Sequence, residues 1–405
     1  MTASVSRGQS FAEIKLGDAV TFQRGFDITK NEQTEGNVPI VSSSGVSSFH
    51  NQWKTKGPGV VIGRKGTLGT VHYLQCDFWP HDTTLWVKDF KGNDRRLIYY
   101  FLQTLHLENF DTGASNPTLN RNHLHKIKVV FPCQGIQKKI AAVLSAYDDL
   151  IENNRRRIAL LEKMAEEIYR EWFVRMRFPG HEQAKFEKGV PVGWSQVQLG
   201  DIADINTHSI KRGREPEWIE YLDISAVSTN QMTAPSKIKF SEAPGRARRL
   251  VEHGDVIWSS VRPGNRAYCL VLNPPDSLVA STGFAVITPK SAIPYSFVHQ
   301  VVTTDGFVEE MVSVAKGAAY PATSFEDFER AKVLLPNTPL LKRFHENCEP
   351  LLLQADRFRK QIPLLSDLRD VLLPRLISGK LAVDNLDIRF PPSMTEPGNG
   401  VPEAA

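Results

Sequence analysis

Apolar residues follow one spacing rule in two long stretches of the chain, with alternating steps of four and three residues. The first stretch comprises Ile140, Leu144, Tyr147, Ile151, Asn154, Ile158, Leu161, Ala165, Ile168 and Trp172, and the second comprises Phe344, Cys348, Leu351, Ala355, Phe358, Ile362, Leu365, Arg369, Leu372 and Leu376. Each second position lies 204 residues after its counterpart (344 − 140). This alternation is typical of a coiled-coil seam. It predicts two long helices, a central one over 133–178 and a C-terminal one over 337–381.

We expect the two helices to pack antiparallel, because the long module between them must bring the chain back. The seam should bring Ile151, Asn154, Ile158 and Leu161 against Phe358, Ile362 and Leu365. Asn154 is the kind of polar seam residue that fixes register and partner. Pro350, Pro363 and Pro374 lie within the second stretch, and an interior proline removes a backbone hydrogen bond. The second helix is therefore expected to be broken or bent, continuous in path but not straight.

A β-rich pattern precedes each long helix. Short apolar runs predict strands at 59–63 and 83–87 in the first half and at 254–258 and 284–287 in the second, followed by amphipathic helices over 97–107 and 295–302. The predicted fold class is α+β. It consists of two similar, mixed, β-rich domains separated by two long antiparallel helices, which form a coiled-coil spacer with an approximate two-fold relation.

Short phrases recur in both halves and mark two copies of one unit. Gly113-Ala114-Ser115-Asn116-Pro117 returns as Gly317-Ala318-Ala319-Tyr320-Pro321, and Leu16-Gly17-Asp18 returns as Leu199-Gly200-Asp201. The modules are predicted to span 12–132 and 179–336. Residues 1–11 are expected to form a flexible N-terminus. The Pro/Gly-rich stretch 382–405 is expected to be a disordered tail.

Composition narrows the class of protein. Hydrophobic residues make up 41% and charged residues 23% of the 405 positions, as in ordinary globular proteins. The net charge of +4 allows a nucleic-acid partner without requiring one. The four cysteines never form a C-x-x-C pair, which favours a reducing cytoplasm. No apolar run reaches 18 residues, so we expect no membrane span.

The motifs of common enzymes are missing. There is no phosphate-binding loop of the G-x-x-x-x-G-K-[ST] type, and the glycines of 63–69 favour a basic turn. The phrase Asn273-Pro274-Pro275-Asp276 is similar to the adenine methyltransferase motif, but it lacks the aromatic residue, and no glycine-rich cofactor loop precedes it. His123 and His125 should face the same side of an extended segment and could chelate a metal, but no third ligand is nearby in sequence. We therefore expect no catalytic residue, no cofactor and no metal on this chain.

Basic and small polar residues gather in predicted loops of both modules. The candidate DNA-binding residues are Ser43, Ser44, Arg64, Lys65, Thr67, Asn116, Asn120 and Arg121 in the first half, and Lys211, Arg212, Arg246, Arg248, Ser260, Arg262, Asn265, Arg266, Lys316 and Tyr320 in the second. Arg and Lys neutralise phosphates, and Arg, Asn and Ser also contact base edges. Any single cluster is equally well explained as a solvated surface. Their recurrence in both halves favours DNA.

Three phrases resemble one known family. They are Ala-Tyr-Asp-Asp-Leu-Ile-Glu-Asn-Asn-Arg-Arg-Arg-Ile at 146–158, Leu-Leu-Pro-Arg-Leu-Ile-Ser-Gly-Lys-Leu at 372–381, and Pro191-x-Gly193-Trp194 before Leu199-Gly200-Asp201. Their order and duplication are similar to those of the specificity subunits of type I restriction–modification systems, over roughly residues 12 to 385. The first module lacks the Pro-x-Gly-Trp opening.

The resemblance implies a non-catalytic DNA-specificity subunit. The modules over 12–132 and 179–336 would be target recognition domains that bind the two halves of an asymmetric, bipartite site in double-stranded DNA. The helices would form a spacer that sets the gap between the half-sites. The implied partners are two methyltransferase (M) subunits and, in the full complex, restriction (R) subunits, for adenine methylation or cleavage.

Two other hypotheses stay open on the sequence. One is a self-contained DNA adenine methyltransferase or fused restriction enzyme, which the missing cofactor loop disfavours. The other is a helical scaffold that does not bind DNA. Methylation by the purified chain would favour the first, and salt-dependent DNA binding by the modules would count against the second.

Overall fold

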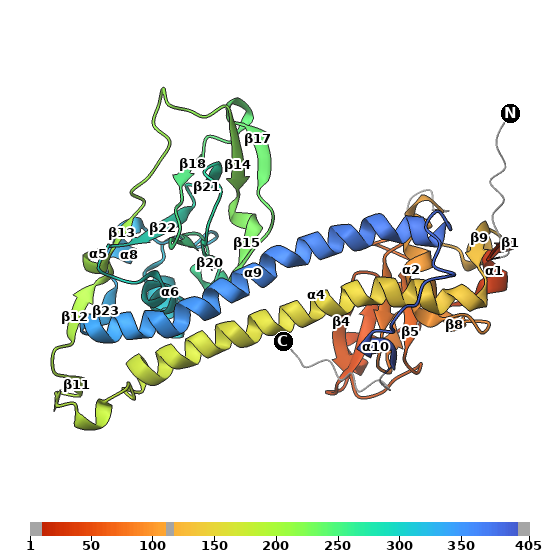
Figure 1. Cartoon of the computed structure of the whole chain (residues 1–405), viewed down its shortest axis with the longest axis horizontal. Coiled ribbons are helices and arrows are strands. Elements are labelled where there is room, and N and C mark those ends of the chain that lie inside the picture. Colours follow the sequence, from red (N-terminus) through yellow and green to blue (C-terminus); the bar gives the residue numbers. More distant parts are fainter. Residues whose placement is uncertain (1–9, 111–116, 396–405) are drawn as a thin grey trace. The chain divides into compact units, whose positions relative to one another are not determined.

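The computed structural model describes residues 10–110 and 117–395 and divides the chain into two compact units. Unit 1 comprises the residues up to 154 and from 361 onward, and unit 2 comprises residues 155–360. Both boundaries fall inside long helices, α4 (Gln134–Tyr169) and α9 (Thr338–Ile377), so each unit contains one part of each helix (Figure 1). The structure thus contains both long helices that the apolar ladder predicts.

Unit 1 combines two sheets with short helices. Its main sheet has the order β2 (Thr21–Arg24), β8 (Thr84–Asp89), β5 (Gly59–Gly63), β6 (Val71–Leu74), and a smaller sheet has the order β4 (Gly45–His50), β3 (Val38–Ser42), β7 (Trp79–Pro80). β1 (Phe11–Lys15) pairs with β9 (Lys128–Pro132), and the helices before α4 are α1 (Leu16–Ala19), α2 (Arg95–Gln103) and α3 (Arg121–Leu124). The strand expected at 59–63 and the helix expected near 97–107 are both present.

Unit 2 repeats this plan with additions. Its main sheet has the order β13 (Ala203–Ile205), β22 (Phe284–Pro289), β19 (Val256–Ser259), β20 (Tyr268–Leu270), and the second has the order β17 (Ser236–Lys239), β14 (Trp218–Leu222), β21 (Leu278–Ser281), β18 (Ala247–Leu250). β12 (Ser195–Gln198) pairs with β23 (Lys332–Leu335), and two hairpins join β10 (Phe186–Glu187) to β11 (Val190–Pro191) and β15 (Val227–Ser228) to β16 (Gln231–Met232). The helices are α5 (Leu199–Ile202), α6 (Tyr295–Thr303), α7 (Asp305–Val314) and α8 (Phe325–Arg330).

The two main sheets agree residue by residue at their centre. In unit 1, Val61 pairs with Trp86 across β5 and β8, and in unit 2, Ile257 pairs with Val286 across β19 and β22. The smaller sheets share a parallel pair, β3 with β7 and β14 with β21, and only the sheet of unit 2 adds β18. Two similar β-rich modules, as the repeated phrases predict, are confirmed.

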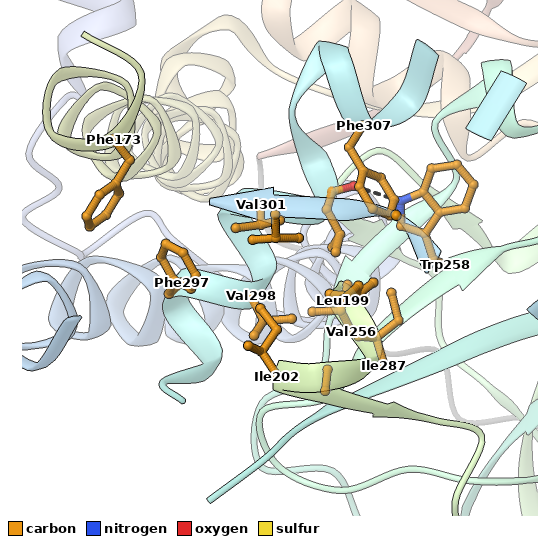
Figure 2. Close-up of a cluster of buried hydrophobic side chains, with 14 of the residues drawn as sticks. Phe173, Leu199, Ile202, Val256, Trp258, Ile287, Phe297, Val298, Val301 and Phe307 are labelled. Carbon is orange, nitrogen blue, oxygen red and sulfur yellow. Dashed lines mark hydrogen bonds between the residues drawn. The ribbon is translucent and has the colours of Figure 1, made fainter. Parts of the chain in front are cut away.

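Each main sheet is covered on one face by helices that bury a core. In unit 2, Phe297, Val298 and Val301 of α6 pack against Val256 and Ile287 of the sheet (Figure 2). Trp258 is fully buried, and its indole N–H donates to the Val302 carbonyl (3.0 Å). The core of unit 1 joins the sheet and α2 to the start of α4, with Leu376 and Ile377 from the end of α9. Burial of these faces explains why each module forms a compact unit.

Within each unit, α4 and α9 run antiparallel. In unit 1, the Asn154 amide donates to Gln361 (3.2 Å) and Arg369 donates to Asp148 (2.6 Å). In unit 2, the Arg157 guanidinium lies 5.4 Å from the Phe358 ring centre, and the Tyr169 and Phe344 rings are 6.2 Å apart. In these contacts, higher residue numbers in α4 pair with lower residue numbers in α9, as in an antiparallel pair. Of the predicted seam residues, Ile151, Asn154 and Ile158 are buried, and Leu161, Phe358, Ile362 and Leu365 are half-buried.

Two expectations about the C-terminal region can be compared with the structure. Helix α9 continues through Pro350, Pro363 and Pro374 without a break, as expected of a helix that is continuous in path. Each proline removes one backbone hydrogen bond, but the buried side chains along α9 offset that loss.

The disordered tail expected over 382–405 is not observed for residues 382–395. Val383 is buried in the core of unit 1, and the Lys139 ammonium donates to the carbonyls of Asp384 (2.6 Å) and Leu386 (3.0 Å). Arg96 donates to the Ser393 carbonyl (2.8 Å) of the short helix α10 (Pro392–Thr395). Among the described residues, no helix is long and apolar enough to cross a membrane.

Candidate nucleic-acid interface

In unit 1, the turn that follows β5 is fixed by backbone hydrogen bonds on two sides. The N–H groups of Arg64 and Lys65 both donate to the Thr83 carbonyl (2.8 and 3.0 Å). The Leu119 N–H donates to the Arg64 carbonyl (3.0 Å), and Lys65 forms an isolated antiparallel β-bridge with Thr118. We call this arrangement the turn frame: the turn after the central strand, joined to the segment that precedes the short helix α3.

Basic side chains project from the turn frame of unit 1. Arg64 donates to the Asp82 carbonyl (3.3 Å), and Arg24 forms an ion pair with the Asp82 carboxylate (2.8 Å). Partial burial, with repulsion from Arg24, lowers the pKa of the Arg64 guanidinium. Lys65 and Thr67 are exposed to solvent. Phosphate or base-edge acceptors could therefore reach a cationic surface at this turn.

The other predicted residues of unit 1 divide into exposed and structural ones. Ser44 and Arg121 are exposed, and Asn120 caps α3 by accepting from the Asn122 N–H (2.9 Å). Ser43 is buried, and its carbonyl accepts from the Thr70 hydroxyl (2.5 Å), which holds the β3–β4 turn beside the turn frame. Asn116 lies outside the described residues.

Unit 2 contains the same turn frame at equivalent positions. The Ser260 N–H donates to the Gly283 carbonyl (3.0 Å), the Thr323 N–H donates to the Ser260 carbonyl (2.9 Å), and Val261 bridges Ala322. These bonds match those of Arg64, Leu119 and Lys65. The match makes Ser260 the counterpart of Arg64, and Arg262 the counterpart of Gly66.

Four predicted residues of unit 2 lie at or next to this turn frame. Arg262 and Arg266 flank the 3-10 turn η7 (Pro263–Asn265), whose last residue, Asn265, is exposed. Arg262 stacks over the Tyr320 ring (4.7 Å to the centroid), and Arg266 forms an ion pair with Asp305 (2.6 Å). The hydrogen bond to Asp305 raises the pKa of Arg266.

The last two predicted residues at this turn frame differ in exposure. Lys316 is exposed and exchanges two backbone hydrogen bonds with Ala322 (2.9 Å each). Ser260 is buried, and its hydroxyl donates to the Gly283 carbonyl (2.8 Å). Ser260 therefore holds the turn in place.

A second basic group lies at the start of β18. The Arg246 guanidinium donates to the Tyr221 hydroxyl (3.1 Å) and to the Asp223 carboxylate (2.6 Å). Burial raises the pKa of the Asp223 carboxyl. Its hydrogen bonds and the charge of Arg246 outweigh this and hold the pKa below its usual value. Arg248 stacks over Phe240 (4.7 Å), and its carbonyl accepts from Ile210, next to exposed Lys211 and Arg212.

Backbone hydrogen bonds link this group to the turn frame of unit 2. The Thr282 N–H donates to the Arg246 carbonyl (2.8 Å), and the neighbouring Gly283 carbonyl accepts from Ser260. The predicted residues of unit 2 therefore form one connected basic region.

The sequence pattern does not identify Arg24 as a member of these surfaces, whereas Arg249 belongs to the basic run at 246–249. Arg24 ends β2, and it reaches Arg64 only because β2, β8 and β5 are neighbours in the sheet. Arg249 lies on β18, where it stacks over Phe325 (5.2 Å) and donates to Ser209 (3.3 Å). No local sequence signal marks Arg24, because its position depends on strand pairing.

No metal-binding or catalytic group follows from the predicted histidines. Arg121–Leu124 is helical rather than extended, so His123 and His125 do not lie on one side of a strand; the ring of His125 accepts from the Phe22 N–H (2.9 Å). Among the described residues, Asp27, His81 and Asp82 bring three ligand atoms within 4.8 Å of one another. Arg24 already pairs with Asp82, so a cation would compete with the guanidinium.

Comparisons with known proteins agree with this arrangement. Residues 9–163 match the family model for the type I restriction modification DNA specificity domain. The chain is 28% identical over 305 residues to the MjaIX type I restriction enzyme specificity subunit of Methanocaldococcus jannaschii, covering 71% of this chain and 69% of that protein. It is 21% identical over 408 residues to the MjaVIII specificity subunit of the same organism, covering 92% and 93%.

A solved structure has the same fold. The crystal structure of the type I restriction–modification S subunit from M. genitalium superposes with a TM-score of 0.62 at 16% identity, covering 93% of this chain and 99% of that one.

Proposed function

The chain belongs to the specificity subunits of type I restriction–modification systems, and from this premise we propose how it recognises DNA. Each module binds one half of a bipartite, asymmetric site through the side chains around its turn frame. One observation carries the proposal: the turn frame occurs in both units with nearly identical backbone bonds but different side chains. Two such modules suit a site whose halves differ in sequence.

The residues that we assign to DNA contact are exposed or half-buried and lie around each turn frame. In unit 1 they are Arg64, Lys65, Thr67, Asn120 and Arg121, and in unit 2 they are Arg262, Asn265, Lys316 and Tyr320, with Arg246, Arg248, Lys211 and Arg212 beside them. Lys and Arg bind phosphates, and Arg and Asn also recognise base edges. Arg246 and Arg266 already pair with carboxylates, so their geometry is fixed before DNA arrives.

We infer that this chain has no methyltransferase, ATPase or nuclease activity of its own. Catalysis would come from two methyltransferase subunits and, in the full complex, from restriction subunits. Exposed apolar side chains on the long helices support such partners. Leu364, Leu368 and Val371 lie on one face of α9 in unit 1, and Leu160 and Met164 lie four residues apart on α4 in unit 2.

The paired helices act in this proposal as the spacer between the half-sites. Inserting four residues near Glu162 would lengthen α4 by about 6 Å. DNA rises about 3.4 Å per base pair, so the gap should grow by one or two base pairs. The bases of both half-sites should stay the same. An insertion that changed those bases but kept the gap would contradict the spacer role.

Loop exchange tests the division of labour between the modules. Replacing the loops at 64–67 and 116–121 should change one half-site only, and replacing those at 262–266 and 316–320 should change the other. The measurement is the map of methylated adenines in DNA from cells that express the chain with its methyltransferase subunits. A loop exchange that altered both half-sites would contradict the modular function. Methyl transfer from S-adenosylmethionine by the purified chain alone would favour an enzyme instead.

A further inference from the structure

We propose that Arg262 recognises a guanine in the half-site bound by unit 2, and that Tyr320 positions it by stacking. The inference rests on the proposed function and adds to it the base and the residue pair. Three observations support it: the backbone conformation of Arg262, the surroundings of its guanidinium, and the contrast with Gly66 of unit 1.

The backbone of Arg262 is in the left-handed region, at φ 50°. Its counterpart in the turn frame of unit 1 is Gly66, at φ 77°. Glycine adopts this conformation without strain, whereas a residue with a side chain adopts it only at a cost. The same turn can therefore be made by glycine, and unit 2 instead carries a long cationic side chain at the strained position. Strained residues of this kind concentrate at functional sites.

Two backbone hydrogen bonds hold this strained turn in place. The Arg262 N–H donates to the Pro321 carbonyl (2.7 Å), and the Arg262 carbonyl accepts from the Asn265 N–H (2.9 Å). Pro321 follows Tyr320 directly, so the bond that holds the backbone of Arg262 also holds the ring beside its guanidinium. The turn frame thereby fixes the backbone from which both the Arg262 and the Tyr320 side chains extend.

The guanidinium of Arg262 differs from its neighbours in having no carboxylate partner among the described residues. Arg246 donates to Asp223 and Arg266 donates to Asp305, each at 2.6 Å. Arg262 instead lies over the ring of Tyr320, 4.7 Å from its centroid, and that tyrosine is 69% exposed. The stacked face is satisfied by the ring, and the N–H donors at the guanidinium edge stay available for a ligand.

The free edge of the Arg262 guanidinium fits a ligand that offers two hydrogen-bond acceptors in one plane. Guanine presents N7 and O6 in the major groove, and a planar arginine fork donates to both at once. A lysine ammonium at the same place would supply a point charge without this geometry. A phosphate would also accept from the fork. Only the guanine contact makes binding depend on one base, and the test separates the two.

The experiment uses the full chain assembled with its methyltransferase subunits and a DNA library randomised at each position of both half-sites. Bound DNA is selected and sequenced. For the wild-type chain we expect a guanine at one position of the half-site of unit 2. Arg262→Gly should keep the turn, because glycine suits its φ, and should lower the preference for that guanine by roughly 5- to 100-fold. Preferences at all other positions should be unchanged.

Three further variants make the result specific. Arg262→Lys keeps the charge and should lose the guanine preference as Arg262→Gly does. Tyr320→Phe keeps the ring and should match the wild type, whereas Tyr320→Leu should lose part of the preference. Thermal unfolding of Arg262→Gly at or above the wild-type temperature would show that the loss is not caused by misfolding.

Two outcomes would overturn the inference. In one, Arg262→Lys and Arg262→Gly keep every base preference. In the other, they weaken binding equally for all sequences, which would make Arg262 a phosphate contact. If the wild-type complex selects no sequence at all, the proposed function fails instead. The two failures are therefore distinguishable.

Discussion

Units 1 and 2 share a backbone plan and differ in the side chains that it presents. At the three turn-frame positions, unit 1 has Arg64, Lys65 and Gly66, and unit 2 has Ser260, Val261 and Arg262. The positive charge thus lies on the first two of these positions in unit 1 and on the third in unit 2. The backbone bonds that fix the turn are kept, since they involve only N–H and C=O groups. A module of this kind can change the contacts that it offers to DNA without changing its fold.

The smaller sheets differ more than the main sheets. Unit 2 adds β18, which carries Arg248 and Arg249 and is preceded by Arg246. Unit 1 has no counterpart of β18 in its sheet of β4, β3 and β7. The additional strand enlarges the basic region beside the turn frame of unit 2. Removal of one basic side chain should therefore weaken DNA binding by the two modules to different extents.

The largest effect should come from the core positions that are equivalent in the two main sheets. Trp258 of unit 2 and Ile62 of unit 1 are both fully buried, and the sheet registers place them at the same point. Trp258→Ala should cost about 3–5 kcal/mol and Ile62→Ala about 2–5 kcal/mol of unfolding free energy. Hydrogen exchange should show lost protection mainly in 155–360 for Trp258→Ala and mainly in 10–110 for Ile62→Ala. Equal loss in both units from either change would contradict two separate cores.

Much of this fold could be predicted because burial imposes a period on the sequence. The ladder through Ile151 and Ile158 revealed α4, and the apolar run at Gly59–Gly63 revealed β5. The tail could not be predicted, because its apolar contacts, Val383, Ile388 and Met394, are irregularly spaced, and other contacts are made by polar groups such as Lys139. Irregular spacing leaves no period to detect.

The equivalence of Gly66 and Arg262 could not be predicted either. The central strands are offset by 196 residues (257 − 61), whereas the Gly-Ala-x-x-Pro phrases are offset by 204 (321 − 117). No single shift of the sequence aligns both parts of the turn frame. Local clustering alone identifies the basic candidates, and it therefore groups buried Ser43 and Ser260 with exposed residues.

The next largest effect concerns partner binding through the long helices. Leu368 of α9 is 53% exposed between Leu364 and Val371. If this stripe is buried by a methyltransferase subunit, Leu368→Ala should weaken association by about 1.5–3 kcal/mol, the value of burying one such side chain. Titration calorimetry with the purified subunit measures the change. Leu160→Ala is the matched variant in unit 2, and an unchanged affinity in both would exclude these faces from the contact.

A smaller effect is expected at the arginines that join α9 to α4. Arg359 pairs with Glu162 in unit 2, and burial raises the pKa of Glu162 while Arg359 opposes that rise. Arg359→Ala should cost about 1–3 kcal/mol at neutral pH, because it leaves a half-buried carboxylate without its donor. The pKa of Glu162 should then rise further above its unfolded value. The folded state binds the proton more tightly, so stability should increase as pH falls through that pKa and decrease as pH rises.

Denaturant unfolding at several pH values between 5 and 7 tests this expectation. The matched change in unit 1 is Arg369→Ala, where Tyr100 still donates to Asp148. The loss of stability there should be smaller. A pH dependence of Arg359→Ala that matches the wild type would show that Glu162 does not sense Arg359.

The smallest effect should arise at exposed lysines that contact phosphate. Lys65 of unit 1 and Lys211 of unit 2 are both exposed. Each phosphate contact releases condensed counterions, so Lys65→Ala and Lys211→Ala should each lower the slope of log affinity against log salt by about one. Affinity should fall equally for all DNA sequences, because a phosphate carries no base identity. Binding titrations of the assembled complex over a range of salt concentrations measure the slope. A change in the selected bases with either variant would instead place that lysine in base recognition, and the two units would then differ in which part of the turn frame recognises sequence.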